Sequence, residues 1–149
     1  MSTFLFSKKS YSAGETVLLG RKCAGKLKPG DVLCLEGELG AGKTTFVRGI
    51  ARGLGWKGHV KSPGFVLVIP YDTQPPLIHG DLYRLKTNDV AGLGLQDYFD
   101  GEHIVIIEWA DRMDKKSFDD ELLVVFDVRE KFREIQFYSA GGRFKQFKL

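Results

Sequence analysis

The chain has 149 residues, of which 43% are hydrophobic and 28% charged, and its formal net charge is +3. These values are typical of a globular protein and not of a disordered one, and the length predicts a single domain over residues 1–149. No apolar run reaches the roughly 18 residues that a membrane span needs, and no hydrophobic segment of a signal peptide follows the N-terminal lysines. Two cysteines cannot form a disulfide framework, so we expect a cytoplasmic protein with no membrane partner.

The first half of the chain alternates between helical and strand patterns. Ser12 and Glu15 have the spacing of a capping box, and apolar residues at helical spacing follow until Pro29-Gly30, which ends the predicted helix. Residues 32–35 form an unbroken apolar run that is typical of a buried parallel strand. Helical periodicity returns over Lys43–Leu54, which predicts a second amphipathic helix.

The second half has mostly strand patterns. The predicted elements are strands at 65–71 and 77–83, a short helix at 88–93, a strand at 104–107 ending on Glu108, and a hairpin of 122–128 with 134–140. Strand–helix alternation followed by hairpins predicts an α/β fold with a mixed sheet and helices on its faces. The last segment, 129–149, has six basic and two acidic side chains, and we interpret this +4 charge as solvated surface.

Residues 37–44 match the phosphate-binding pattern G-x-x-x-x-G-K-[ST] between a predicted strand and a predicted helix. Its glycines let backbone N–H groups converge on phosphate oxygens, and the helix directs its positive end at them. Lys43 would reach the β and γ phosphates, and the Thr44 hydroxyl would bind Mg²⁺. The motif predicts a three-layer, P-loop NTPase-like fold. The predicted nucleotide-binding residues are Gly37, Glu38, Leu39, Gly40, Ala41, Gly42, Lys43, Thr44 and Thr45.

Two carboxylates are candidates for the chemistry beside this loop. Glu108 ends a buried strand, and if that strand runs parallel to 32–35 its side chain lies beside Thr44 as a second Mg²⁺ ligand. Period-two alternation over 77–83 places Asp81 and His79 on one face, and Asp81 would orient the attacking water. We interpret His79 as a hydrogen-bonded structural histidine. The predicted catalytic residues are Lys43, Asp81 and Glu108.

Four segments occur together in order: 36–46, Val60-Lys-Ser-Pro63, His79-Gly-Asp-Leu-Tyr-Arg84 and Ile107-Glu-Trp109. In combination they resemble the bacterial TsaE (YjeE) ATPase family of the tRNA threonylcarbamoyladenosine pathway, over about two thirds of the chain. The resemblance implies slow Mg²⁺-dependent ATP hydrolysis, TsaD and TsaB partner subunits, and contact with tRNA only through that complex. It also implies a switch-like role for 61–63. Gly64 departs from the family, which usually has Thr or Ser there.

Three other functions compete with this hypothesis. A small P-loop kinase of a nucleoside or another small molecule would use the same loop, but no arginine cluster is placed for a lid. An RNA-binding module would use Tyr138, Phe144, Phe147 and the basic tail as a stacking surface, although these aromatics fit a sheet core better. A GTPase is disfavoured because the guanine motif N-K-x-D does not occur.

Overall fold

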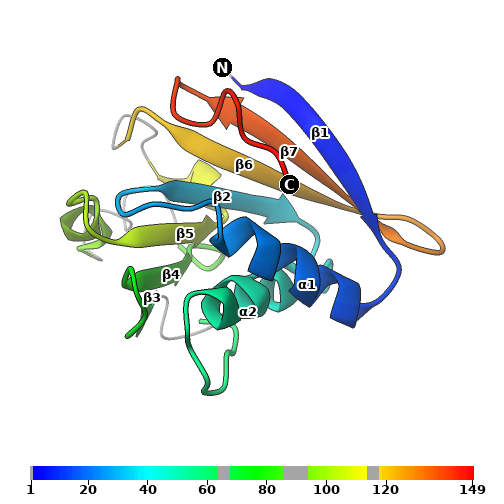
Figure 1. Cartoon of the computed structure of the whole chain (residues 1–149), viewed down its shortest axis with the longest axis horizontal. Coiled ribbons are helices and arrows are strands. Elements are labelled where there is room, and N and C mark those ends of the chain that lie inside the picture. Colours follow the sequence, from blue (N-terminus) through cyan, green and yellow to red (C-terminus); the bar gives the residue numbers. More distant parts are fainter. Residues whose placement is uncertain (1, 64–67, 86–93, 114–117) are drawn as a thin grey trace.

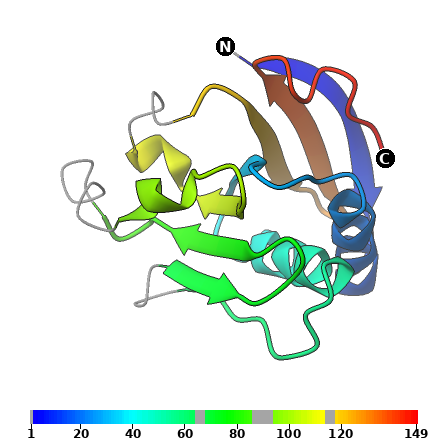
Figure 2. The ribbon, with the colours of Figure 1, turned by 60° about the vertical axis from the view of Figure 1, so that its left-hand side comes forward.

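The structure is a computed structural model that describes residues 2–63, 68–85, 94–113 and 118–149 (Figure 1). Its elements, with η for a 3-10 helix, are β1 (Thr3–Ser10), α1 (Ala13–Ala24), β2 (Val32–Gly37), α2 (Lys43–Gly53), β3 (Val68–Tyr71), β4 (Leu77–Asp81), η2 (Leu95–Tyr98), β5 (Ile104–Glu108), η3 (Ala110–Arg112), β6 (Glu121–Val128) and β7 (Arg133–Ala140). The described strands form a seven-stranded sheet in the order β1-β7-β6-β2-β5-β4-β3. Figure 2 shows how strongly this sheet twists between its β3 and β1 edges.

The centre of the sheet is parallel and its margins are antiparallel. β6, β2, β5 and β4 run in the same direction, β3 pairs antiparallel with β4, and β7 and β1 continue the other side. The register sets Glu108 opposite Leu35 on one side and opposite Asp81 on the other. The carboxyl ends of three neighbouring strands therefore meet in one row, which is where open α/β sheets bind ligands.

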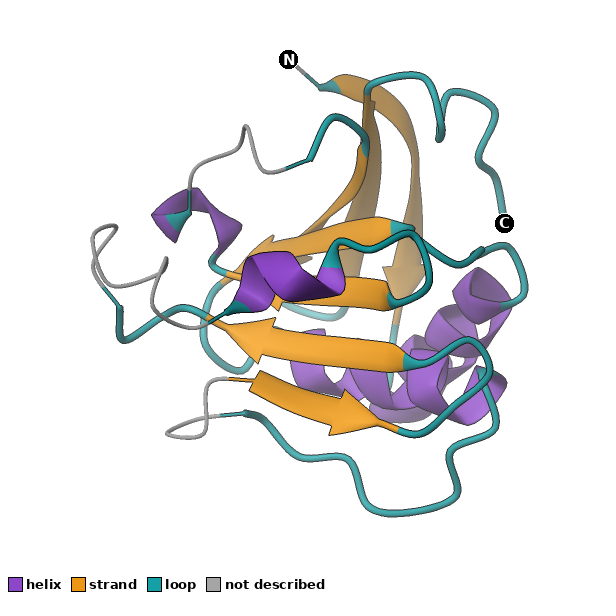
Figure 3. Cartoon of the chain, turned by 90° about the vertical axis from the view of Figure 1, so that its left-hand side faces the viewer, coloured by secondary structure: helices purple, strands orange, loops and turns teal. Residues whose placement is uncertain are grey.

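Both faces of the parallel strands are buried, which explains their unbroken apolar sequences. On one face, Leu33 and its neighbours pack against α1 and α2. On the other face, Val32 packs in a cluster with Leu95 of η2 and Ala110 of η3. The result is the predicted three-layer arrangement, with the short 3-10 helices on the face opposite the two long helices (Figure 3). No helix in the described ranges is both long and apolar enough to cross a bilayer.

α1 and α2 contact each other backbone to backbone. A Cβ atom added at Gly20 of α1 would collide with the carbonyl oxygen of Phe46, and one added at Gly49 of α2 would collide with that of Val17. Only glycine permits this approach, because it lacks a Cβ atom. The contact fixes the axis of α2, and therefore the position of its first turn, where the phosphate-binding motif ends.

The capping prediction for α1 is confirmed in part. The Ser12 hydroxyl accepts from the Glu15 amide at 3.1 Å, but the Glu15 carboxylate accepts from the Tyr11 amide, one residue before the cap. The helix ends at Ala24, earlier than the Pro29-Gly30 stop predicts. Leu27 is nevertheless buried, which is why it fits the helical periodicity without being in the helix.

The first strand is the element that differs most from the sequence-based predictions. β1 was not predicted, and it forms an edge of the sheet by pairing with β7. Phe144 and Phe147 are buried in the core, where Phe147 packs against Phe6 of β1 and against Phe137. The prediction that these tail aromatics fit a core better than an RNA-stacking surface is therefore confirmed for Phe144 and Phe147, because buried rings cannot contact bases. The predicted helix at 88–93 and the start of the strand at 65–71 lie outside the described residues.

Candidate functional site

The phosphate-binding motif forms a curled loop between β2 and α2. Gly37, Gly40 and Gly42 have φ angles of 151°, 80° and 108°, a region that side chains disfavour. Gly42 is the N-cap of α2, and among the described residues no side chain caps this helix. The first-turn N–H groups of a helix have no intrahelical acceptor, and the positive end of the helix dipole lies there. The loop therefore has the donors and the charge of an anion-binding site.

Lys43 folds back into this loop. Its ammonium donates to the carbonyl oxygen of Gly37 at 2.5 Å, lies 3.9 Å from Oε1 of Glu108, and sits 4.8 Å from the centre of the Trp109 ring. Lys43 is only 5% exposed, so its positive charge is held in a largely dry environment by an ion pair and an aromatic face. An incoming phosphate would offer this cation a stronger acceptor than the carbonyl.

Glu108 is a buried carboxylate with two different partners. Its Oε2 atom lies 2.6 Å from Nε2 of His79, and its Oε1 atom faces Lys43. His79 is completely buried, which confirms the interpretation of a hydrogen-bonded histidine. The sequence did not identify its partner, because the pair joins β4 to β5 across 29 positions and depends on the register of two strands.

Asp81 lies beside Glu108 at the end of β4. Its Oδ1 atom accepts from the amide of Tyr83 at 3.0 Å. Burial raises the pKa of the Asp81 carboxyl above its ordinary range, the Tyr83 amide opposes this effect, and the charge of Glu108 adds to it. The structure thus brings Lys43, Glu108 and Asp81 together, as predicted, at the carboxyl ends of the parallel strands.

Side-chain oxygens of the kind that bind Mg²⁺ occur on the elements that meet at this end of the sheet. Thr44 and Thr45 are in the first turn of α2 and half-buried, and Glu108 and Asp81 supply carboxylates. The described residues contain no cluster of three or more His, Cys, Asp or Glu side chains able to hold a metal by themselves. This donor set fits Mg²⁺, which commonly takes one or two protein oxygens together with phosphate oxygens and water.

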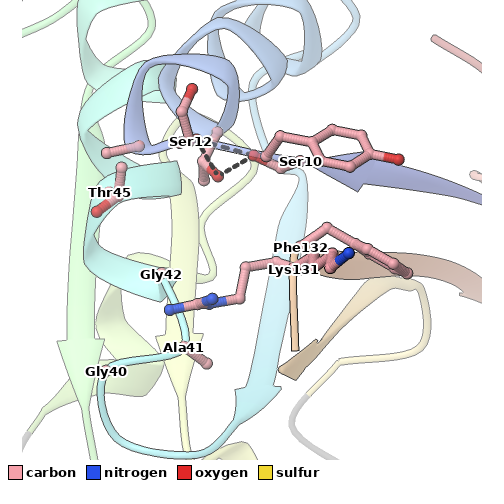
Figure 4. Close-up of a pocket in the computed structure, with 12 residues that line it drawn as sticks. Ser10, Ser12, Gly40, Ala41, Gly42, Thr45, Lys131 and Phe132 are labelled. Carbon is pink, nitrogen blue, oxygen red and sulfur yellow. Dashed lines mark hydrogen bonds between the residues drawn. The ribbon is translucent and has the colours of Figure 1, made fainter. Parts of the chain in front are cut away.

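A pocket of about 390 Å³ adjoins the loop (Figure 4). It lies between Gly40–Gly42, the start of α1 and the turn that joins β6 to β7. The Phe132 ring in that turn lies 5.6 Å from the Tyr11 ring and 4.9 Å from the ammonium of Lys9. The lining residues are Ser10, Tyr11, Ser12, Ala13, Thr16, Gly40, Ala41, Gly42, Thr45, Lys131, Phe132 and Arg133.

A second hollow of about 400 Å³ lies at the start of the loop, lined by Leu35 to Glu38 and by Trp109. Trp109 has a φ angle of 61°, a left-handed conformation that is rare for a large residue, and its ring packs 4.9 Å from that of Tyr83. Strained residues cluster at functional sites. Trp109 was not among the predicted site residues, although its position directly after Glu108 was a usable signal.

The predicted switch segment is described only in part. Lys61 and Ser62 are exposed, whereas Pro63 is buried. Gly64, the position that departs from the resembled family, lies outside the described residues, so the role of 61–63 stays a prediction.

Comparison with known proteins identifies the family. Residues 10–135 match a family model described as "Threonylcarbamoyl adenosine biosynthesis protein TsaE". The chain belongs to the TsaE family. The tRNA threonylcarbamoyladenosine biosynthesis protein TsaE of Bacillus subtilis is 41% identical over 133 residues, covering 88% of this chain and 84% of the relative. TsaE of Streptomyces coelicolor is 36% identical over 135 residues, covering 84% and 90%.

A solved TsaE-like structure supports the fold. The crystal structure of Bacillus subtilis YdiB superimposes with a TM-score of 0.79 at 36% identity, covering 97% of this chain and 91% of that one. The mixed α/β fold predicted from the sequence is thereby confirmed. The family also agrees with the resemblance carried by the four sequence segments.

Proposed function

We propose that this TsaE-family chain binds ATP with Mg²⁺ at the P-loop and hydrolyses it slowly in support of tRNA threonylcarbamoyladenosine formation. The observation that supports this most directly is the convergence of three features on one point. The uncapped N-terminus of α2, the ammonium of Lys43 and the carboxylate of Glu108 all meet at the end of the parallel sheet. Backbone donors, a cation and an acid able to hold a metal are the parts that phosphoryl transfer requires.

The phosphates and the nucleoside of the bound nucleotide would occupy different parts of the site. Residues 37–45 would hold the phosphates through backbone N–H groups, with Lys43 leaving the carbonyl of Gly37 for the β and γ phosphates. The pocket beside Gly40–Gly42 has the volume and the aromatic side chains, Tyr11 and Phe132, to take the nucleoside. Hydroxyl groups also line it, among them Ser10, which is hydrogen-bonded to Thr16 at 2.7 Å.

The hydrolytic step uses the two carboxylates. Thr44 and Glu108 would hold Mg²⁺, which neutralises charge on the phosphates when bound. Asp81 would orient the attacking water, since its raised pKa makes it a better proton acceptor than an ordinary aspartate. Glu108, Lys43 and Asp81 are all part of this one crevice, so each is expected to affect turnover.

The biological setting rests on the family. Relatives carry the name tRNA threonylcarbamoyladenosine biosynthesis protein. We therefore place the chain in the cytoplasm with TsaD-like and TsaB-like subunits, and we expect it to meet tRNA only through that assembly. Its ATPase cycle would drive or reset the modification that the partners perform.

Calorimetry with the purified protein tests the nucleotide site. We expect binding of Mg²⁺-ATP by the wild type and loss of at least tenfold in affinity for Lys43→Ala, alone or with both partner subunits. If the wild type gives no heat of Mg²⁺-ATP binding in either condition, the proposal is contradicted. A parallel assay with nucleosides as acceptors tests the kinase alternative, because phosphorylated nucleoside would support it instead.

A cellular assay tests the pathway. We expect neither Lys43→Ala nor Glu108→Ala to restore threonylcarbamoyladenosine in tRNA of cells depleted of this protein. The modified nucleoside is measured by mass spectrometry of digested tRNA. Wild-type levels in cells that carry either variant would remove the link between the P-loop and tRNA modification.

A further inference from the structure

His79 is a buried polar residue whose single described hydrogen bond is directed at the proposed site. It lies in β4, opposite Ile106 of β5, two positions before Asp81 and on the same face of the sheet. The imidazole has no exposed surface, and its Nε2 atom lies 2.6 Å from Oε2 of Glu108. Among the described residues, its other nitrogen, Nδ1, is buried without a hydrogen-bond partner.

This arrangement fixes how the imidazole is used. Glu108 is paired with the Lys43 ammonium, so it acts as an acceptor, and the bond then requires Nε2 to carry the proton. Nδ1 is left without a partner, which is unfavourable for a polar atom in a buried position. An aliphatic side chain would avoid that cost, so packing alone does not explain a histidine here.

The two carboxylate oxygens of Glu108 therefore have different partners. Oε2 is held by His79, and Oε1 faces the ammonium of Lys43 at 3.9 Å. Rotation of the Glu108 carboxylate is therefore restrained by His79 at one oxygen and by Lys43 at the other. When a nucleotide draws Lys43 away, Oε1 is the oxygen left pointing at the phosphate-binding loop.

We propose that His79 is a positioning residue that holds Oε2 of Glu108 and so presents Oε1 to the metal of a bound Mg²⁺-nucleotide. The inference rests on the proposed function and adds which residue orients the carboxylate of Glu108. Partners that orient a metal ligand typically change metal affinity or activity by about 10–100-fold when they are removed. His79 should therefore matter for metal affinity and not for metal-free nucleotide binding.

The test replaces the ring nitrogen that bonds Glu108. In His79→Gln the amide nitrogen lies near the position of Nε2, whereas in His79→Asn it lies near that of Nδ1; both can donate. His79→Leu removes the donor. His103→Gln is the control, because His103 also bonds a carboxylate, Asp100, at 2.7 Å, but in a partly exposed loop.

Two affinities are measured on each folded variant: that for ADP in EDTA by calorimetry, and that of the ADP complex for Mn²⁺ by electron paramagnetic resonance. We expect ADP affinity without metal to stay within about twofold, and Mn²⁺ affinity to fall about tenfold or more in His79→Leu and His79→Asn. His79→Gln should stay within about threefold of the wild type, like His103→Gln. If His79→Leu does not fold, the difference in Mn²⁺ affinity between His79→Gln and His79→Asn decides whether His79 positions Glu108.

The outcomes separate this inference from the proposed function. Normal ADP binding with equal Mn²⁺ affinity in the wild type, Asn and Leu variants overturns the positioning role and leaves the P-loop proposal intact. Equal losses in the Gln and Asn variants also overturn it, because a merely structural histidine predicts no preference for the Nε2 position. No ADP binding by the wild type overturns both.

Discussion

The ammonium of Lys43 lies 4.8 Å from the centre of the Trp109 ring, so the cation of the phosphate-binding loop is packed against an indole. The same ammonium donates to the carbonyl of Gly37, which belongs to the loop itself. Lys43 therefore has protein partners on two sides before any phosphate arrives. Under the proposed function, nucleotide binding would exchange these contacts for phosphate oxygens, and Trp109 is placed to report the exchange.

We expect Trp109 fluorescence to change on nucleotide binding. The chain has two tryptophans, and the Trp56→Phe variant leaves Trp109 as the sole source of indole emission. Titration with ADP should give a saturable change in this variant, because the charge beside the ring moves away. The further change Lys43→Ala should abolish it. Constant emission at ADP concentrations that saturate the calorimetric signal would contradict the exchange.

We expect Phe132→Ala to weaken nucleoside binding selectively. Stacking of a base on an aromatic ring is worth roughly 1–3 kcal/mol, so ADP affinity should fall by about tenfold, whereas the affinity for tripolyphosphate should not change. Phe4→Ala is the matched control, since Phe4 is an exposed aromatic of β1 that contacts Tyr138 and lies outside the lining of the pocket. Equal losses for ADP and tripolyphosphate would place the base elsewhere.

We expect Asp81→Asn to stabilise the nucleotide-free protein at neutral and alkaline pH while it impairs hydrolysis. Because the folded state raises the pKa of Asp81, it binds this proton more tightly than the unfolded chain, and stability falls as the pH rises through that window. Asparagine has no proton to lose, and its side-chain oxygen can still accept from the Tyr83 amide. The variant should therefore melt at a higher temperature than the wild type at pH 8.

Thermal unfolding followed by circular dichroism between pH 4 and pH 8 checks the direction of this pH dependence. The difference in Tm should shrink toward the acid end, where the wild-type carboxyl is protonated in the folded protein too. A difference that stays constant across the range would attribute the gain to a change in packing and not to the charge.

We expect Gly20→Ala to destabilise the protein by roughly 1–3 kcal/mol, because the added methyl group forces two helix backbones apart. Gly14→Ala is the control in the same helix. Its Cβ would meet only the Ser12 hydroxyl at 3.8 Å, so it should be neutral or stabilising by up to about 1 kcal/mol. Urea unfolding measures both free energies, and similar values for the two variants would show that the helices can separate without cost.

The features that the sequence predicted are those encoded by neighbours along the chain. The motif at 37–44, the apolar strand before it and the amphipathic helix after it are local patterns, and each lies where expected. The apolar runs at 32–35 and 104–107 indicated buried parallel strands, and their pairing placed Glu108 beside the P-loop.

The features that the sequence missed depend on contacts between distant segments. β1 is an edge strand whose exposure does not alternate cleanly, so its pairing with β7 is decided by tertiary contacts. The bond between His79 and Glu108 follows from the register of β4 against β5, and the left-handed turn at Trp109 has no signature in residue type.

The glycine contact between α1 and α2 also has a mechanical meaning. Two helices that touch through their backbones have no flexible side chains between them to absorb a displacement. α1 begins at the wall of the pocket proposed for the nucleoside, and α2 begins at the loop proposed to hold the phosphates. The nucleoside and the phosphates of the proposed ligand would therefore contact one rigid unit. A displacement of either helix would move both parts of the site.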